Sequence, residues 1–211
     1  HRRRIIKVDN ELNFLNYFAS QKREKSRAKI IAVTGSAGKT SLKNLIKDQL
    51  DSFGKTFCSP KSFNNYLGVP LSLSQLNTNH QFAVFEVGMS KAGEIHSLSK
   101  LIKPHIGIIT NIGEAHIENF KNLNGIAKAK GEIINNIQKN GTLILNRDDK
   151  YFDYFKKRAK FKNLRVISFG ISKKSDIYPI SFKRNKKEKK LTLKIWDHIL
   201  KIKVKNLNIH N

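Results

Sequence analysis

The sequence predicts an α/β fold, with a mostly parallel sheet of the phosphate-loop type, helices on both faces and a small antiparallel sheet near the C-terminus. Three observations predict it. Short apolar runs rich in β-branched residues alternate with segments of helical spacing, a glycine-rich turn joins the first run to a helix, and the last segments change to two-residue alternation. Because strands that alternate with helices favour parallel pairing, we expect a sheet that is covered on both sides.

Five apolar segments predict the parallel strands, at residues 28–35, 81–88, 105–113, 141–146 and 163–170. Helices are expected at residues 8–26, 41–50, 93–103, 123–138 and 148–160, and in the apolar end of KSFNNYLGVPLSL. In the helix at 41–50, one side should carry Leu42, Leu45, Ile46 and Leu50. The last three strands, at residues 176–184, 190–196 and 199–207, predict an antiparallel subsheet over about 176–206.

The composition is that of one domain with a real core, since 39% of the 211 residues are hydrophobic. The chain begins at His1 and its single methionine is Met89, so we expect a piece of a longer protein. The single cysteine, Cys58, cannot form an internal disulfide, and no apolar run is long enough to span a bilayer. The expectation is a monomer in the cytoplasm, with no membrane partner.

The net charge of +25 raises the possibility of a nucleic-acid partner, because cationic side chains that neutralise phosphates drive such binding. The charges are scattered, however, through polar segments such as QKREKSRAK and RNKKEKK, and no stacking aromatic residues are interleaved with them. Abundant Lys, Asn and Ile share A/T-rich codons, which explains the charge at least as well. We therefore expect no nucleic-acid partner.

The stretch TGSAGKTS, from Thr34 to Ser41, has the composition and context of a phosphate-binding loop. Its glycines permit a turn whose N–H groups point at phosphate oxygens, and the following helix adds its positive end. Lys39 would bind the β and γ phosphates, and the Thr40 hydroxyl would bind Mg²⁺. The alternative is an ordinary glycine turn, which the apolar strand before the loop and the helix after it disfavour. The predicted ATP contacts in this loop are Gly35, Ser36, Ala37, Gly38, Lys39, Thr40 and Ser41.

Polar side chains also follow two other predicted strands. Glu86 ends one strand, and Asn111 and His116 follow the next, so all three are expected at the sheet edge where ligands of open α/β sheets bind. Together Glu86 and His116 could hold a metal ion. A capping or solvated Glu and a structural His are the alternatives, and spacing alone singles out neither Lys128 nor Lys130. The adjacent Asn64 and Asn65 could simply form a turn through local hydrogen bonds.

Taken in order, six segments resemble the Mur ligase family of bacterial cell-wall synthesis. They are TGSAGKTSLK, KSFNNYLGVPLSL, FEVGMSKAGEI, ITNIGEAHIENF, IAKAKGEI and LILNRDD, from about Lys29 to Asp149, and the final IHN also fits. The resemblance implies an N-terminal domain for a UDP sugar, a central ATPase domain and a Rossmann-like C-terminal domain. Residues 1–27 would then be a linker or remnant of the first domain, residues 28–211 the central domain, and the C-terminal domain would be absent.

The resemblance also implies roles for particular residues. The catalytic set would be Lys39, Glu86, His116 and Lys130. Two Mg²⁺ ions would be bound, by Thr40, Glu86, His116 and Lys130, the last as a carbamate. Asn64 and Asn65 would lie near the substrate, and Asn111 and Asn211 near the nucleotide.

The reaction that the resemblance implies is ATP-dependent amide formation. KSFNNYLGVP and EVGMSKAGEI favour the member that joins D-alanyl-D-alanine to UDP-MurNAc-tripeptide through an acyl phosphate. The alternatives are a Mur ligase that adds the third residue, a nucleic-acid-associated P-loop NTPase, and a fragment that only binds ATP. The isolated central domain should have little or no activity, because closure over both substrates would be lost.

Overall fold

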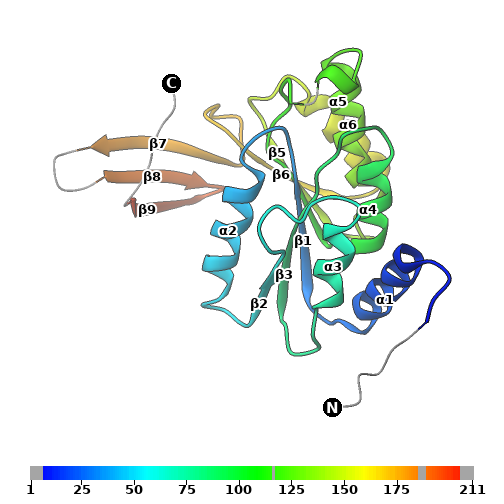
Figure 1. Ribbon diagram of the computed structural model, residues 1–211. Coiled ribbons are helices and arrows are strands. Elements are labelled where there is room, and N and C mark those ends of the chain that lie inside the picture. The colour runs from blue at the N-terminus through cyan, green and yellow to red at the C-terminus, as the bar shows by residue number, and fades with distance from the viewer. Residues whose placement is uncertain (1–6, 116, 185–188, 205–211) are drawn as a thin grey trace.

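The computed structural model describes residues 7–115, 117–184 and 189–204, and within them it confirms the predicted α/β class. Nine strands form one sheet in the order β2-β3-β1-β4-β5-β6-β7-β8-β9 (Figure 1). The strands are β1 (Lys29–Thr34), β2 (Thr56–Cys58), β3 (Phe82–Glu86), β4 (Ile106–Ile109), β5 (Thr142–Asn146), β6 (Arg165–Phe169), β7 (Ile177–Arg184), β8 (Lys189–Ile195) and β9 (His198–Val204). Pairing is parallel from β2 to β7 and antiparallel from β7 to β9.

The helices also follow the prediction, with differences at their ends. They are α1 (Glu11–Lys25), α2 (Lys39–Leu50), α3 (Gly68–Ser74), α4 (Glu94–Ile102), α5 (Leu123–Lys130) and α6 (Phe152–Phe161), and two short 3-10 helices, η1 (Ile117–Asn119) and η2 (Gly131–Asn136). The helix predicted over 123–138 is thus divided into α5 and η2. Strand β2 was not predicted, because three residues are too few for a periodic pattern. None of the described helices is both long and apolar enough to cross a membrane.

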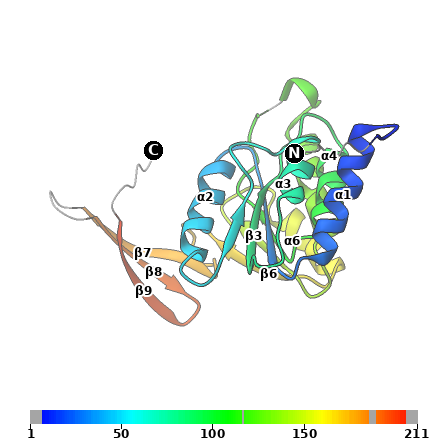
Figure 2. The same ribbon diagram turned by 60° about the horizontal axis from the view of Figure 1, so that its bottom comes forward.

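Both faces of the parallel part of the sheet are covered, but unequally, whereas β7 to β9 extend beyond the helices (Figure 1). On one face, Ile31 and Val33 of β1 pack with Val84 and Ile108 under α2, while the alternate residues of β1 belong to the larger core on the other face. That larger core receives buried side chains from α1, α3, α4, α5 and α6. Figure 2 shows the strands between α2 on one side and α1, α3 and α4 on the other. Burial on both faces explains why β1 reads as a continuous apolar run.

Helix α2 corrects one sequence prediction. Its residues Leu42, Ile46 and Leu50 pack on the sheet as expected, but Leu45 is 60% exposed. The helix packs against β1, β2 and β3, towards the edge formed by the unpredicted strand β2. Lys43 and Leu45 lie on opposite sides of the row formed by Leu42, Ile46 and Leu50, and the side of Lys43, which is only 1% exposed, is the buried one.

The predicted antiparallel subsheet is present as an extension of the main sheet and not as a separate one. Strands β6 and β7 pair in parallel at a single register position, Phe169 with Ile177, and β8 and β9 then follow as a meander. A register irregularity lies between Pro179 and Ser181, where proline lacks the N–H that the ladder requires. Residues 185–188 and 205–206 of the predicted span lie outside the described residues.

Helix α1 lies within the segment that was predicted to be a linker or domain remnant. It packs on α3 and α4, and its Ala19 is fully buried in the larger core. The Arg23 guanidinium donates from Nε to the Ile102 carbonyl (2.6 Å) and from a terminal nitrogen to the Lys103 carbonyl (2.7 Å), which closes the C-terminal end of α4. The described part of this segment is therefore attached to the domain, while the domain limits stay predictions.

A histidine joins β1 to the start of β4. The His105 backbone N–H donates to the Ile30 carbonyl (2.9 Å), and the Ile30 N–H donates to His105 Nδ1 (2.9 Å). Burial, together with the positive charges of Arg23 and Lys29, lowers the pKa of His105 to about 4. A neutral ring is required here, because protonation of Nδ1 would remove the acceptor.

Replacing His105 with Asn should flatten the acid dependence of stability. The unfolded chain binds this proton near pH 6.5 and the folded protein only near pH 4, so stability is complete above 6.5 and falls as the pH drops through this window. The loss in wild type should be about 2–3 kcal/mol. His105→Asn keeps an acceptor near the Nδ1 position and should lack this loss in urea unfolding at pH 7 and pH 4.5. His198→Asn, on an exposed position of β9, is the control; equal pH dependence of all three proteins would refute the assignment.

Candidate nucleotide and metal site

The glycine-rich loop follows β1 at the carboxyl end of the sheet, and two of its glycines are required by geometry. Gly35 has φ 146°, and a Cβ there would lie 1.8 Å from Thr110 Oγ1. Gly38 has φ 78° and is the N-cap residue directly before α2. The chain therefore turns sharply against the end of β4, and the N-terminus of α2 opens towards the loop.

Residues after β4 hold this loop in shape. Asn111 Oδ1 accepts from the Ala37 N–H (2.9 Å), and the Asn111 carbonyl accepts from the Ser36 N–H (2.9 Å). Thr110 Oγ1 donates to the Ala37 carbonyl (2.7 Å), and the Gly113 N–H donates to Ser36 Oγ (2.8 Å). Asn111, predicted as a nucleotide contact, thus lies on the loop itself. The role of Thr110 was missed, and its position before Asn111 at a strand end was the available signal.

Two lysines converge on one carbonyl oxygen of the loop. Lys39 Nζ donates to Gly35 O (2.9 Å) and Ser36 O (3.3 Å), and Lys130 Nζ donates to Gly35 O (3.0 Å). Lys130 is only 1% exposed, whereas Lys128 on the same helix is exposed. Packing therefore identifies Lys130 as the lysine of the site, which the spacing in the sequence did not. The two ammonium groups create a positive site suited to phosphate oxygens.

Burial and mutual repulsion change how these lysines titrate. Burial, assisted by the positive charge of Lys39, lowers the pKa of Lys130 to about 8. Burial also lowers the pKa of Lys39, and the negative charge of Glu86 partly offsets this. Lys130 therefore has a substantial neutral fraction near physiological pH.

Glu86 ends β3 beside the loop and is only 1% exposed. Its Oε2 accepts from Thr40 Oγ1 (2.7 Å), and its Oε1 accepts from Asn64 Nδ2 (2.7 Å). Both partners are uncharged. The Glu86 carboxylate and the Thr40 hydroxyl, which are both hard oxygen ligands, lie together next to the positive loop. This pair fits Mg²⁺, which prefers oxygen ligands. Proteins typically supply one or two of these ligands, and water molecules and phosphate oxygens supply the others. No group of three His, Cys, Asp or Glu side chains suited to a metal ion occurs within the described residues.

A cavity of about 300 Å³ opens beside these groups. Asn65 lies on the wall of this cavity. The Asn65 Oδ1 accepts from the N–H groups of Leu67 (3.2 Å) and Gly68 (2.8 Å), which is the local turn given above as the alternative to a substrate contact. The lining residues are Lys39, Asn64, Asn65, Tyr66, Gly88, Met89, Ser90, Glu94 and Lys130. The cavity therefore joins the loop lysines to the Asn64–Asn65 segment.

The structure brings together most, but not all, of the predicted site. Loop residues 35–40 lie with Glu86, Asn64, Asn111 and Lys130, while Ser41 lies exposed at the first turn of α2. His116 and Asn211 lie outside the described residues, so their roles stay predictions. The sequence pattern assigned no role to Asp149, whose Oδ2 accepts from the Ile112 N–H (2.7 Å) and so fixes the segment after β4.

The chain is similar to known proteins over most of its length. Residues 33–211 match the model of the Mur ligase middle domain. The UDP-N-acetylmuramoyl-tripeptide–D-alanyl-D-alanine ligase of Rickettsia prowazekii is 42% identical over 183 residues, covering 85% of this chain and 40% of that protein. A crystal structure of MurF from Acinetobacter baumannii superposes with a TM-score of 0.88 at 30% identity, covering 97% of this chain and 44% of that one. MurF from Thermotoga maritima, solved in complex with ADP, gives 0.84 at 25% identity, with 96% and 46% covered.

The chain spans about two fifths of the length of the curated relatives that it matches. The family model nevertheless covers strands β2 to β9, the last two residues of β1, the glycine loop and every described residue of the candidate site. This chain belongs to the Mur ligase family and contains its middle domain.

Proposed function

We propose that the protein containing this chain joins D-alanyl-D-alanine to the free carboxylate of UDP-MurNAc-tripeptide, with conversion of ATP to ADP and phosphate. The observation that carries the proposal is the convergence of Lys39 and Lys130 on the phosphate loop, next to the Thr40–Glu86 pair. The names of the relatives supply the substrates, and this chain shares with them the domain in which the site lies.

The reaction needs cations because two anions must approach each other. A carboxylate oxygen of the peptide attacks the γ-phosphorus, the bond from that phosphorus to the β-phosphate oxygen breaks, and ADP leaves. The amine of the dipeptide then attacks the carbonyl carbon of the acyl phosphate, the bond to the phosphate oxygen breaks, and the amine loses a proton. Lys39 and the loop N–H groups bind the phosphates and stabilise the charge of the transferred group.

Thr40 and Glu86 are proposed to bind Mg²⁺, and His116 and the second Mg²⁺ stay predictions from the resemblance. When bound, Mg²⁺ would neutralise phosphate charge during transfer. The support is the chemistry of the pair: a buried carboxylate whose two oxygens already have donors, one of them a hydroxyl that is itself a Mg²⁺ ligand type.

Lys130 is proposed to carry a carbamate, formed when its neutral amine adds to CO₂ and releases a proton. With a pKa of about 8, about a quarter of the side chains are neutral at a pH of about 7.5, against about one in a thousand at the usual pKa of 10.5. The modification would replace a cation with a carboxylate-like ligand for Mg²⁺. Burial therefore supports the reactivity that the modification requires.

The direct test is phosphate release by the full-length product of the gene. With ATP, Mg²⁺ and UDP-MurNAc-tripeptide present, release should require D-alanyl-D-alanine, because the acyl phosphate turns over only when an amine attacks it. Release that does not depend on the dipeptide would refute the assignment. A free amino acid offered to the UDP-dipeptide should give no product, and product there would identify a ligase that adds the third residue.

Lys130→Ala should lower dipeptide-dependent phosphate release at least ~100-fold, since it removes both the amine and any carbamate. Lys128→Ala, on an exposed position of the same helix, should leave it unchanged. In wild type, removal of dissolved CO₂ and bicarbonate should lower the rate, and bicarbonate should restore it. An active Lys130→Ala protein, or a rate insensitive to bicarbonate, would contradict the proposed carbamate.

Glu86→Gln should raise the Mg²⁺ concentration needed for half-maximal activity about tenfold or more, because it exchanges a carboxylate ligand for a neutral amide of the same shape. The measurement is a Mg²⁺ titration of the initial rate at saturating substrates. Asp153→Asn, on an exposed position of α6, removes one negative charge elsewhere and is the control. Identical Mg²⁺ curves for wild type and Glu86→Gln would remove Glu86 from the metal site.

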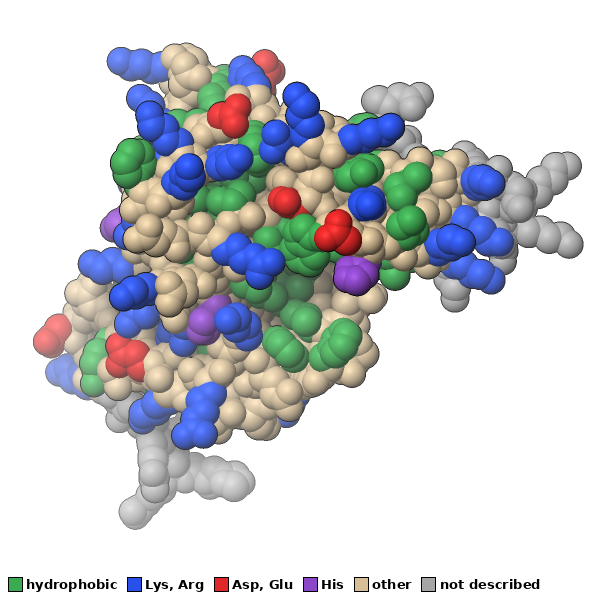
Figure 3. Space-filling view, turned by 180° about the vertical axis from the view of Figure 1, so that it is seen from behind, with side chains coloured by type: hydrophobic (Ala, Val, Ile, Leu, Met, Phe, Trp, Pro, Cys, Tyr) green, Lys and Arg blue, Asp and Glu red, His purple; other side chains and the backbone are tan. Residues whose placement is uncertain are grey.

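The alternative of a nucleic-acid-associated NTPase rests on the net charge alone. Figure 3 shows Lys and Arg side chains spread over one face among acidic, apolar and uncharged ones, with no single basic strip. The alternative predicts ATP hydrolysis that DNA stimulates and that salt weakens steeply. DNA should have no such effect on this protein. The monomeric state and the cytoplasmic location stay predictions.

A further inference from the structure

Lys43 is a buried cation that the proposed reaction does not use. It lies on α2, one turn after Thr40, and is only 1% exposed. Its Nζ donates to the carbonyl oxygens of Ser59 (2.7 Å) and Lys61 (2.5 Å). No ion pair joins it to a carboxylate in the part of the chain that the structure describes. Burying an ammonium group is costly unless it is well paired, so its position requires an explanation.

Both acceptors lie at the start of the loop that connects β2 to α3. Lys61 has φ 44°, a left-handed conformation that is unfavourable for a residue with a side chain. Ser59 is buried, its N–H donates to the Val84 carbonyl (3.0 Å), and its Oγ accepts from the Glu86 N–H (3.2 Å). Lys43 thus fixes a strained turn next to the strand that ends in Glu86.

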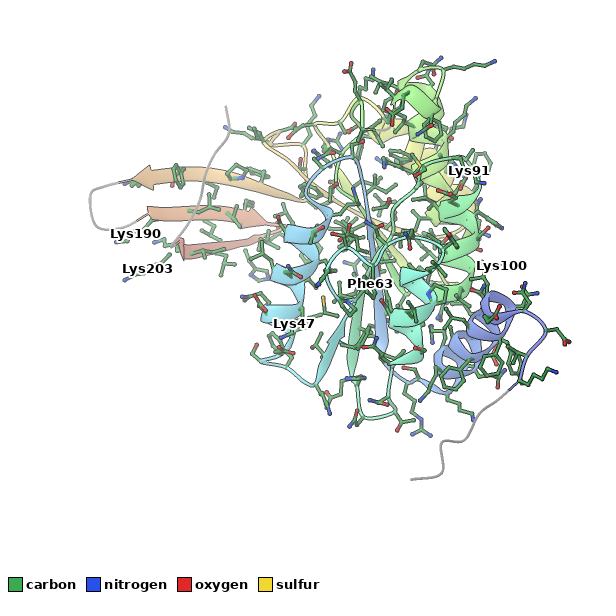
Figure 4. All side chains as sticks on the ribbon, viewed as in Figure 1. Lys47, Phe63, Lys91, Lys100, Lys190 and Lys203 are labelled. Carbon is green, nitrogen blue, oxygen red and sulfur yellow. The ribbon has the colours of Figure 1, made fainter. Side chains whose placement is uncertain are left out.

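The same loop continues to Asn64, the second partner of the Glu86 carboxylate. Besides its side-chain bond to Oε1, Asn64 accepts at its carbonyl from the Gly88 N–H (2.8 Å), and a Cβ on Gly88 would lie 2.8 Å from Asn64 Oδ1. Phe63, labelled near the middle of Figure 4, packs with its backbone against the start of α3, where a Cβ on Gly68 would lie 2.6 Å from the Phe63 Cα. The position of Asn64 is therefore set by the path of the loop.

These contacts close a ring. Helix α2 presents Thr40 to one oxygen of Glu86, the loop presents Asn64 to the other oxygen, and Lys43 ties the loop back to α2. We propose that Lys43 is a positioning residue that holds Asn64 on Glu86, so that the Glu86 carboxylate keeps the orientation in which it binds Mg²⁺ together with ATP. The inference rests on the proposed metal-binding role of Glu86.

An ammonium group suits this task better than a neutral side chain. Its three donors can bond two carbonyls that diverge from different residues, and its positive charge lies in the same buried region as the negative charge of Glu86. Partners in the outer shell of a metal site typically change metal affinity 10–100-fold when they are removed. A residue that only stabilised the fold would lower the melting temperature without changing the Mg²⁺ requirement.

The test is direct binding of ATP to the full-length protein, measured by calorimetry at increasing Mg²⁺ and without peptide substrates. Lys43→Met, which keeps the length of the side chain but removes the charge, should raise the Mg²⁺ concentration for half-maximal binding about tenfold. The control is Lys47→Met, one turn further along α2, where the side chain is partly exposed and pairs with Asp51. Lys47 lies on the half of α2 that is farther from the loop (Figure 4), and its variant should bind like wild type.

Asn64→Ala should raise the Mg²⁺ requirement similarly. The double variant Lys43→Met/Asn64→Ala should require less than about twofold more Mg²⁺ than either single variant, because both changes interrupt the same series of contacts. If Lys43→Met does not fold, Lys43→Gln is judged by the same threshold. A Lys43 variant with a lower melting temperature but an unchanged Mg²⁺ requirement would overturn the proposal, as would effects that multiply in the double variant.

The outcome is separate from that of the ligase assignment. If wild type binds ATP with Mg²⁺ but releases phosphate without regard to the dipeptide, the proposed reaction fails and the role of Lys43 can still hold. If phosphate release depends on the dipeptide but Lys43→Met binds ATP and Mg²⁺ normally, the reverse is true.

Discussion

The Glu86 carboxylate, buried at the end of β3, is the constraint on which the rest of the site depends. A carboxylate in a nearly dry position requires a hydrogen-bond donor for each oxygen, and the two donors come from segments far apart in the chain, Thr40 and Asn64. For Thr40 and Asn64 to reach this carboxylate, α2 must begin directly after the loop, and the connection between β2 and α3 must return to the end of the sheet. One buried charge therefore specifies the positions of three segments.

The positions of the two lysines at the loop are likewise set by hydrogen bonds, one of which joins segments that are far apart in the chain. Lys39 and Lys130 approach a single carbonyl oxygen from a helix start and a helix end. That oxygen belongs to Gly35, whose φ of 146° is a conformation that residues with a side chain rarely adopt. Thr110 occupies the space where a side chain on Gly35 would stand. The loop is thus shaped by its neighbours before any ligand binds, which reduces the ordering that phosphate binding would require.

The sequence predicted those features that local pattern determines. Continuous apolar runs indicated strands buried on both faces, and the loop between a strand and a helix indicated a phosphate site. Packing across the sheet determined the rest. Lys128 and Lys130 stand two residues apart in one predicted helix, yet only Lys130 is buried. Leu45 has the periodicity of a core residue but lies exposed, because α2 buries the side that carries Lys43. The contacts of Asn111 with the loop and of Lys43 with Ser59 join residues 74 and 16 positions apart, beyond the reach of any periodic pattern.

The contact between Arg23 and the end of α4 has a mechanical consequence. Helix α4 begins at Glu94, on the wall of the cavity beside Lys39 and Lys130, and its last carbonyl is bonded by the Arg23 guanidinium. A hydrogen-bonded helix of nine residues is a stiff rod of about 13 Å. The fixed length of α4 therefore links the position of α1 to that of the cavity wall, so that the segment before β1 belongs to the frame that supports the site.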